Sequence, residues 1–344
     1  MTTQVEEATR QPDEELSPWR LAGPVARRRR RRMLLGVVIA FTVLAAFTGF
    51  PTGREVLTLW ILATLLAACG GDVRVWRRAV VRDWMPLLAV LFAYDLLRGV
   101  ANEVGGWVFN LPSWASSPES PGSMARAHLT EPLNVDKSLF GGQVPTVWLQ
   151  RHFYDVGVAH WYDRIAVPVY LSHFLVSLVL AIVLWCVNYR LFRSYVAALV
   201  TLTAITLVTY LAYPAAPPWM AAYNGHLPAV HRVIQDTLAV LGGETLNSAV
   251  EKGAAYSNPV AAMPSLHAAI PMMLLLFFWR EVRVRGRILL ATYAALMALT
   301  LVYAGEHYVA DVLLGWVYAA VTVVGIRVVT ARRATASVLM TTGS

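Results

Sequence analysis

The chain alternates long apolar segments with short loops that carry arginine, and this pattern constrains the fold more than any other feature. A helix needs about 20 predominantly apolar residues to cross a bilayer. With 57% apolar and 15% charged residues, the composition differs from that of a soluble globular domain. The sequence therefore predicts an all-α polytopic membrane protein with about eight transmembrane helices. The eight apolar segments cover residues 33–50, 55–70, 85–102, 165–187, 195–213, 266–280, 288–304 and 308–329.

The distribution of arginine orients these segments in the membrane. Cytoplasmic loops of membrane proteins are enriched in lysine and arginine. If the N-terminus is cytoplasmic, 21 of the 29 basic residues fall on the cytoplasmic side, in residues 1–32, 71–84, 188–194, 280–287 and the tail from Arg327. Every cytoplasmic loop then carries arginine, and one span more or fewer would invert part of this pattern. We therefore expect a multi-pass protein of the cytoplasmic (plasma) membrane with both termini in the cytoplasm.

The two ends of the chain are polar. Residues 1–32 end in six consecutive arginines, and we expect a disordered basic cytoplasmic arm there. The arm is long and no convincing cleavage site follows it, which favours a retained first helix over a cleaved signal peptide. Residues 33–84 are predicted to form a transmembrane helix hairpin, and residues 331–344 a cytoplasmic tail. Residues 144–157 mix aromatic and charged residues, which predicts a short helix in the membrane interface.

The net charge of +8 does not indicate nucleic-acid binding. A nucleic-acid-binding domain carries its basic residues on one soluble face, whereas here they lie at the ends of apolar segments. We therefore expect the lipid bilayer as a partner and no nucleic acid. Cys69 and Cys186 both lie inside apolar segments, and we predict no disulfide.

Two histidines and an aspartate stand out beside the last three apolar segments. His307 and Asp311, in "YAGEHYVADVLLG", have a spacing that places both side chains on one face of a helix. A carboxylate that accepts the proton of one imidazole nitrogen leaves the other nitrogen oriented to act as a nucleophile. His267, in "MPSLHAA", falls at the same extracytoplasmic face by the orientation above. We hypothesise that the three residues meet, so that His267 can protonate a leaving oxygen.

Other interpretations of these residues stay open at this point. An interfacial histidine can extend its ring toward water, and a His–Asp pair at a helix start can act as a cap or a surface pair. Two histidines and an aspartate also match a common metal ligand set, but no Cys or Glu cluster completes it, and we expect neither a metal nor a cofactor. A non-enzymatic transporter would place broken helices near the membrane midplane, whereas these ionisable residues cluster at the outer edge.

The residues around the histidines resemble a known family. "PSLH" followed by "H-x3-D" is similar to the second and third signature motifs of the type 2 phosphatidic acid phosphatase superfamily. Leu266, where the general motif has glycine, and "EHYVAD" resemble the inositol phosphorylceramide synthase-like (aureobasidin-resistance) branch. "YPAAPPWM" is also similar to a segment of this branch, and "YDLLRG" and "VYLSHF" look like its bacterial members. The resemblance implies a six-helix catalytic domain over residues 85–330, preceded by the hairpin.

The resemblance also implies a role for each residue of the site. His307 would be the nucleophile that takes the phosphoryl group, Asp311 would orient it, and His267 would protonate the departing alkoxide. The substrate would be a membrane phospholipid or another lipid phosphate. Phosphatases of the family transfer the phosphoryl group to water, whereas synthases transfer a phosphorylated head group to an alcohol. We expect a lipid phosphotransferase with inositol or a lipid alcohol as a possible acceptor; the alternative is a lipid or polyprenyl phosphate phosphatase.

The sequence departs from the superfamily pattern at its cationic positions. Thr300 and Leu301 replace the Ser-Arg pair of the third motif, and no K-x6-R-P motif precedes "PSLH". Other cations must then stabilise the charge of the phosphoryl group. Arg98, in the third apolar segment, is the leading candidate, with a structural pair to Asp95 as its alternative. The other tentative substrate- or phosphate-binding residues are Lys252, Arg164, His173 and Ser265.

Overall fold

The computed structural model describes residues 24–48, 54–93, 128–242 and 260–342. Within these ranges the regular secondary structure is helical and no strand is present, which agrees with the predicted all-α membrane protein. Residues 1–23 of the basic arm, the second half of the third predicted span, Arg98 and Lys252 lie outside the described residues. Residues 24–32 of the arm, which were expected to be disordered, are instead the first turns of a helix. The chain divides into two compact units, one of residues 1–89 and 178–196 and one of residues 90–177 and 197–344.

The N-terminal part of the first unit is helical, with a π-helical turn at residues 80–84 and a further helical segment from residue 85. Helices α2 (Pro24–Thr48) and α3 (Arg54–Ala68) contact each other through Phe41 and Trp60, whose ring centroids lie 5.2 Å apart. Helix α4 (Val73–Ala79) follows, capped by the Asp72 carboxylate, which accepts hydrogen bonds from two backbone N–H groups. It continues into the π-helical turn η1 (Val80–Trp84). The predicted cytoplasmic loop 71–84 is therefore largely helical, because this cap and the apolar side of the segment support a helix.

A buried carboxylate joins η1 to the rest of the first unit. Asp83 accepts hydrogen bonds from Trp185 Nε1 at 3.1 Å and from the Tyr189 hydroxyl at 2.7 Å. Arg82 Nε forms an ion pair with the same carboxylate at 2.9 Å. Trp84 packs its ring against Trp185. These contacts fix the turn between helices α9 (Trp161–Val187) and α10 (Tyr189–Ala212) within this unit.

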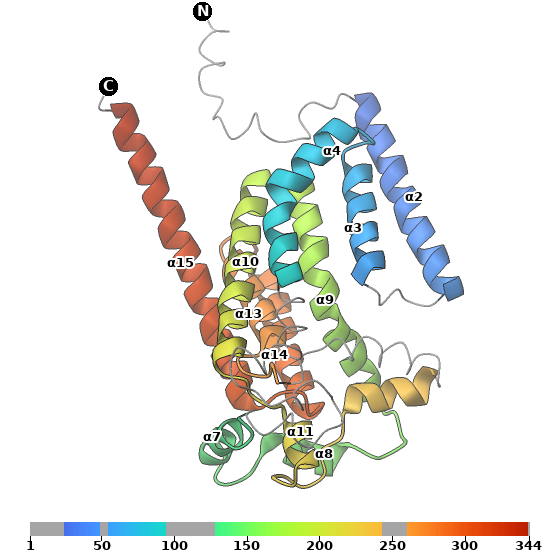
Figure 1. Cartoon of the computed structure of the whole chain (residues 1–344), viewed down its shortest axis with the longest axis vertical. Helices are drawn as coiled ribbons and strands as arrows, with labels where there is room; N and C mark the ends of the chain where they lie inside the picture. Colours follow the sequence, from blue (N-terminus) through green and yellow to red (C-terminus); the bar gives the residue numbers. More distant parts are fainter. Residues whose placement is uncertain (1–23, 49–53, 94–127, 243–259, 343–344) are drawn as a thin grey trace, which may run out of the picture. The chain divides into compact units, whose positions relative to one another are not determined.

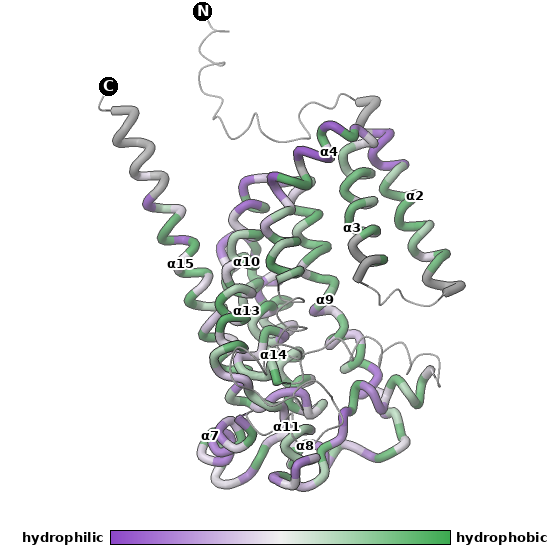
Figure 2. Tube along the Cα trace, in the orientation of Figure 1, coloured by the Kyte–Doolittle hydropathy of each residue, from purple (hydrophilic) through white to green (hydrophobic). Residues whose placement is uncertain are grey.

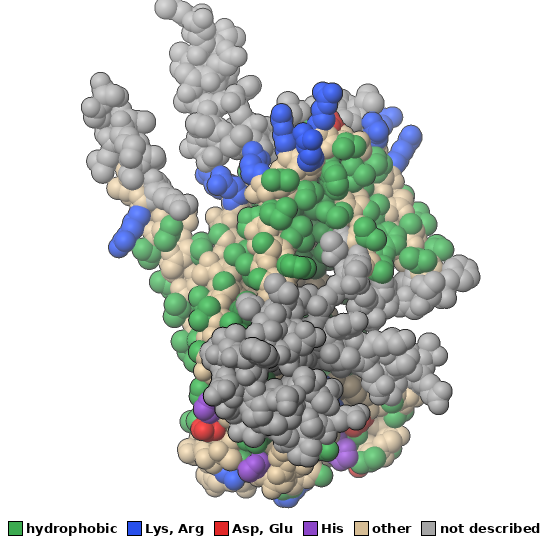
Figure 3. Space-filling view, in the orientation of Figure 1, with side chains coloured by type: hydrophobic (Ala, Val, Ile, Leu, Met, Phe, Trp, Pro, Cys, Tyr) green, Lys and Arg blue, Asp and Glu red, His purple; other side chains and the backbone are tan. Residues whose placement is uncertain are grey.

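Arginine gathers at one end of the first unit. The apolar helix surfaces are covered by exposed hydrophobic side chains, and basic side chains gather beyond them at the upper end in Figure 3. This separation of charge from apolar surface is the arrangement that a lipid bilayer favours. The exposed arginines of the unit include Arg74, Arg77, Arg78, Arg82, Arg190 and Arg193.

The second unit contains the three C-terminal helices of the described residues. Helices α13 (Leu266–Phe278), α14 (Val284–Tyr303) and α15 (Val309–Thr342) lie side by side in Figure 1, and α13 contacts both of the others. Three short helices lie at the end where α15 begins. These are α7 (Glu131–Leu139), α8 (Pro145–Phe153) and α11 (Pro218–Tyr223). Figure 2 shows that the long helices are predominantly hydrophobic and that α7 is largely polar.

Four helices of the described ranges are long and apolar enough to cross a membrane. They are Trp161–Val187 (α9), Tyr189–Ala212 (α10), Val284–Tyr303 and Val309–Arg332. Each matches one predicted span, whereas the predicted span at 266–280 is a helix of 13 residues, which is shorter than the usual crossing length. The total of eight spans and the N-terminal hairpin stay predictions.

The start of α10 differs from the prediction. The helix begins at Tyr189 instead of residue 195, because Asn188 Oδ1 accepts a hydrogen bond from Leu191 N–H at 3.1 Å and so acts as its N-cap. The predicted loop 188–194 therefore shrinks to this one non-helical residue. The predicted helix in residues 144–157 is present as α8.

The contact between α13 and α15 depends on a glycine. A Cβ atom at Gly315 would lie 2.4 Å from the Ser265 carbonyl oxygen, which is closer than a Cβ atom can approach. Ala268 and Ala269 of α13 are both buried, and small side chains let the two backbones come this close. The first turns of the two helices therefore lie against each other.

This close approach predicts opposite effects of alanine at two glycines of α15. Gly315→Ala should lower the free energy of unfolding by about 2 kcal/mol or more, because the methyl group must displace backbone atoms. A Cβ atom at Gly325 would meet no heavy atom within 4 Å, and Gly325→Ala should stabilise by up to about 1 kcal/mol through helix propensity. Thermal unfolding in detergent would measure both, and equal midpoints for the two variants would contradict this packing.

Candidate active site

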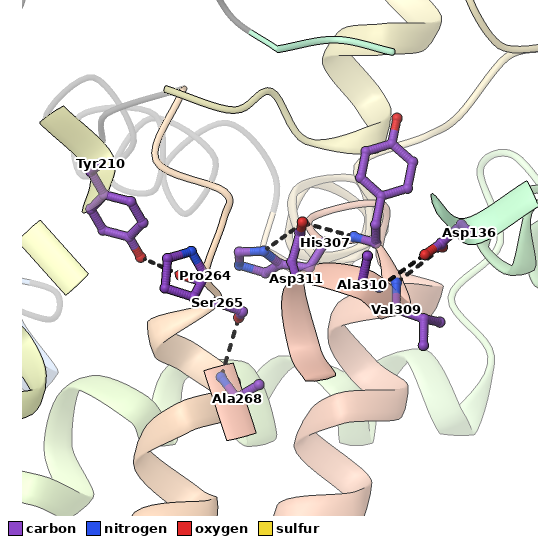
Figure 4. Close-up of polar contacts among 10 residues, drawn as sticks. Asp136, Tyr210, Pro264, Ser265, Ala268, His307, Val309, Ala310 and Asp311 are labelled. Carbon is purple, nitrogen blue, oxygen red and sulfur yellow. Dashed lines mark hydrogen bonds and ion pairs between the residues drawn. The ribbon is translucent and has the colours of Figure 1, made fainter. Parts of the chain in front are cut away.

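His307 and Asp311 form the predicted pair. Both residues are buried, His307 in the turn that precedes α15 and Asp311 in its first turn. His307 Nδ1 donates to Asp311 Oδ2 at 3.4 Å, and the same oxygen accepts the Tyr308 backbone N–H at 3.0 Å (Figure 4). The carboxylate therefore binds one ring nitrogen of His307 and leaves Nε2 available for chemistry.

A second carboxylate caps the helix that carries this pair. Asp136, a buried residue of α7, accepts the N–H groups of Val309 at 3.0 Å and Ala310 at 2.9 Å (Figure 4). These backbone groups have no partner within the helix, so the carboxylate satisfies them and interacts favourably with the positive end of the helix dipole. Sequence reasoning did not identify Asp136; its only signal was an acidic residue in a long outer segment.

The "PSLH" segment leads into α13 and forms hydrogen bonds with residues of α10 and α15. Ser265 Oγ accepts the Ala268 N–H at 3.2 Å and so caps α13. The Ser265 N–H donates to the Asp311 carbonyl oxygen at 3.0 Å. The Tyr210 hydroxyl donates to the Pro264 carbonyl oxygen at 2.8 Å. Ser265 thus has a positional function in the fold, and its tentative role in phosphate binding stays a prediction.

His267 lies beside the His307–Asp311 pair, as hypothesised. The ring centroids of His267 and His307 lie 5.9 Å apart. On its other side, His267 contacts His173 of α9, with ring centroids 4.0 Å apart, and stacks on Tyr170 at 5.0 Å. His173 therefore belongs to the same cluster, whereas the sequence suggested it as one of several candidate phosphate-binding residues.

Polar atoms of this cluster are buried without a hydrogen-bond partner among the described residues. They are His173 Nδ1, His267 Nε2 and Asp311 Oδ1. Such groups cost roughly 1–3 kcal/mol each when buried. Other described residues, such as Thr206 and Thr322, also bury such atoms, so these three mark a local cost in the cluster and do not by themselves assign it a function.

Gln150 of α8 fixes the end of α14 just before the His307 turn. Its Nε2 donates to the Tyr303 carbonyl oxygen at 2.8 Å and to the His231 carbonyl oxygen at 2.9 Å. Its Oε1 accepts the His231 N–H at 2.8 Å. The Tyr303 hydroxyl also donates to the buried Asp163 carboxylate at 2.6 Å. Sequence reasoning missed Gln150, because a single glutamine in a short helix carries no periodic signal.

The structure describes only some of the positions at which the sequence suggested or lacked a phosphate-binding cation. Thr300 and Leu301 are buried in α14, so this part of the third motif supplies no cation. Arg164 is exposed at the start of α9, and its Nε donates to the Ala159 carbonyl oxygen at 3.2 Å. Its role in phosphate binding stays a prediction, as do those of Arg98 and Lys252. In the described ranges, no group of three or more His, Cys, Asp or Glu residues is arranged to hold a metal ion.

A family model described as the PAP2 superfamily matches residues 139–325, which is more than half of the chain. The chain therefore belongs to the PAP2 superfamily, whose members are generally phosphatases or phosphotransferases. The match includes the histidine cluster, Asp311 and Gln150. Comparison with curated proteins and with solved structures gives no match.

Asp136 predicts a dependence of stability on pH. Burial raises the pKa of its carboxyl from 3.8 to about 6, although the hydrogen bonds from Ala310 and Val309 act in the opposite direction. The folded protein therefore binds this proton more tightly than the unfolded chain does. The contribution of Asp136 to the free energy of unfolding should be highest below about pH 4 and fall, by up to about 3 kcal/mol, as the pH rises to about 6.

Thermal unfolding in detergent between pH 4 and pH 7 would measure this slope. Asp136→Asn should flatten it, because the amide does not titrate. Asp155 is exposed, and Asp155→Asn is the matched control that should keep the slope. If Asp136→Asn keeps the slope unchanged, other carboxyl groups cause the pH dependence of stability.

Proposed function

We propose that this membrane protein is a lipid phosphotransferase that acts through a phosphohistidine at His307. The observation that carries the proposal is the arrangement of Asp311, His307 and His267. His307 is hydrogen-bonded to the buried Asp311 carboxylate, and its ring centroid lies 5.9 Å from that of His267. An oriented nucleophile opposite a proton donor is the arrangement that covalent transfer of a phosphoryl group requires.

The reaction would proceed in two balanced steps. In the first step, His307 Nε2 attacks the phosphorus atom, the P–N bond forms, and the bond from phosphorus to the leaving oxygen breaks as His267 gives that oxygen its proton. Asp311 holds Nδ1–H and stabilises the positive charge that develops on the ring. In the second step, an acceptor hydroxyl gives its proton to His267 and its oxygen attacks phosphorus, which breaks the P–N bond and restores His307.

The identity of the acceptor separates transfer from hydrolysis. Leu266 within "PSLH", together with "EHYVAD" and "YPAAPPWM", supports the inositol phosphorylceramide synthase-like branch, in which the acceptor is an alcohol such as inositol or a lipid alcohol. Membership of the PAP2 superfamily also supports a second candidate, a lipid or polyprenyl phosphate phosphatase with water as the acceptor. The absence of the motif arginine at Leu301 favours the transferase.

The position of the cluster on its helices supports a lipid substrate and an extracytoplasmic site in the plasma membrane. His267 lies in the first turn of α13, and the basic segment 280–287 follows the other end of this helix. His307 likewise precedes α15, whose arginines begin at Arg327. By the positive-inside rule the arginine ends are cytoplasmic, so the histidines lie at the opposite face, within reach of lipid head groups.

Turnover by a histidine variant tests the mechanism. Purified protein would be incubated with a panel of phospholipids and lipid phosphates, with and without inositol or a lipid alcohol, and the products identified by mass spectrometry. His307→Ala should lower kcat by at least about 1,000-fold and abolish an acid-labile phosphorylated intermediate, because the nucleophile is gone. His226 is exposed, and His226→Ala is the matched control that should keep full activity.

The products decide between the two candidates. A new phosphodiester would indicate a transferase, and free phosphate a phosphatase. Full activity of His307→Ala would refute the phosphohistidine.

Two single-cysteine variants test the orientation of the site. Cys69 and Cys186 would first be replaced, and a cysteine then placed at Ser138 of α7 or at Arg283, which are both exposed. In whole cells, an impermeant maleimide should label Ser138→Cys directly but Arg283→Cys only after permeabilisation. The reverse pattern would place the histidines at the cytoplasmic face.

A further inference from the structure

Phosphoryl transfer in this site needs a cation that the superfamily motif does not supply here. Negative charge moves between the leaving oxygen and the phosphoryl oxygens in the transition state, and arginine is well suited to bind them. In this chain, Thr300 and Leu301 take the places of the Ser-Arg pair, and both are buried in α14. The cation must therefore come from another part of the chain.

Arg232 contacts the turn that carries His307. Its Nε lies 3.3 Å from Glu306 Oε1, and Glu306 directly precedes His307. The Arg232 side chain is 31% exposed and that of Glu306 11%. The Nη1 and Nη2 nitrogens form no hydrogen bond or ion pair with the described residues. Among the described residues, this part of the guanidinium therefore has no partner next to the turn of the candidate nucleophile.

The backbone beside Arg232 is held against the same turn. Gln150 bonds both the N–H and the carbonyl group of His231, and it also bonds the Tyr303 carbonyl oxygen. Gly305 has a φ of +78°, and a Cβ atom there would lie 2.8 Å from the His231 carbonyl oxygen. Val233 and Ile234, which follow Arg232, are buried. The position of Arg232 relative to residues 303–306 is therefore fixed by packing.

An aromatic ring holds the guanidinium from another direction. Arg232 Cζ lies 4.5 Å from the ring centroid of Trp219, a cation–π contact. The Trp219 backbone N–H in turn donates to the Gly305 carbonyl oxygen at 3.2 Å. Trp219 therefore links the "PAAPPW" segment to the turn before His307. Glu306 and Trp219 restrict the guanidinium, and no other described residue binds its outer nitrogens.

We propose that Arg232 binds the phosphate group of the substrate and takes the place of the missing motif arginine. This inference rests on the proposed function, in which His307 receives the phosphoryl group. Glu306 binds Nε, and Nη1 and Nη2 would then bind two oxygens of one phosphate, a bidentate contact that lysine does not reproduce. A purely structural role would be small, since partly exposed ion pairs contribute little to stability.

The test compares arginine variants by ligand binding and by turnover. Arg232→Gln and Arg232→Lys would be purified in detergent, with Glu306→Gln alongside them. Arg287→Gln is the matched control, because Arg287 is also partly exposed and lies over a tryptophan ring, that of Trp279, but it belongs to the start of α14. Binding of orthovanadate, a phosphate analogue, would be measured from the shift in Tm, and kcat/KM with the lipid substrate found above.

Arg232→Gln should weaken vanadate binding and lower kcat/KM by about 100-fold, with Arg232→Lys intermediate. Added guanidinium should partly restore turnover of Arg232→Gln but not of His307→Ala. Arg287→Gln should match the wild type. If Arg232→Gln and Glu306→Gln have equal and non-additive effects that guanidinium does not relieve, Arg232 only holds Glu306 and the proposal is overturned.

The outcomes also separate this proposal from the proposed function. Normal turnover in Arg232→Gln, with turnover lost in His307→Ala, would overturn the role of Arg232 and leave the mechanism intact. If the wild-type protein turns over no lipid in the panel, the vanadate measurement still decides whether Arg232 binds phosphate. Binding that depends on Arg232 would support the phosphate site, and binding that does not would overturn it.

Discussion

The hydrogen bond from the Ser265 N–H to the Asp311 carbonyl oxygen is the contact on which the candidate site depends. It joins the first turns of α13 and α15, and it forms because Gly315 has no side chain to separate the two backbones. His267 lies two residues after one end of this bond, and His307 lies four residues before the other. This backbone contact thus holds the two segments that carry His267 and His307 next to each other.

Buried polar groups from the outer segments stabilise the helix ends around this contact. Asp136 satisfies two N–H groups at the start of α15, and Gln150 binds the last residue of α14. Burying a carboxylate or an amide is costly unless its hydrogen bonds are complete. Here they constrain the turn from Ala304 to Tyr308, which carries the candidate nucleophile. The short helices α7 and α8 therefore have a function in the site although they contribute no candidate catalytic residue.

The sequence predicted best those features that depend on neighbouring residues. The spans in α9, α14 and α15 were placed within a few residues, because long apolar runs between arginines can fold stably only in the membrane. The cap at Asn188 shifted the start of α10, since one polar residue can begin a helix inside a segment that looked like a loop. Asp136 acts on a backbone 173 residues away and Gln150 on one 153 residues away, so no local pattern in the sequence could reveal them.

By itself, the sequence determined a helical membrane protein and predicted the pairing of His307 with Asp311 from their spacing at a helix start. His307 lies in the turn just before α15, so its contact with Asp311 depends on the shape of this turn. Only the tertiary structure decided that His267 and His173 lie beside this pair and that Arg232 reaches the preceding turn. These neighbours come from separate segments, and their positions follow from the packing of α13 on α15 and from hydrogen bonds between distant loops. Such contacts depend on the shape of the folded chain, which the order of the residues alone does not display.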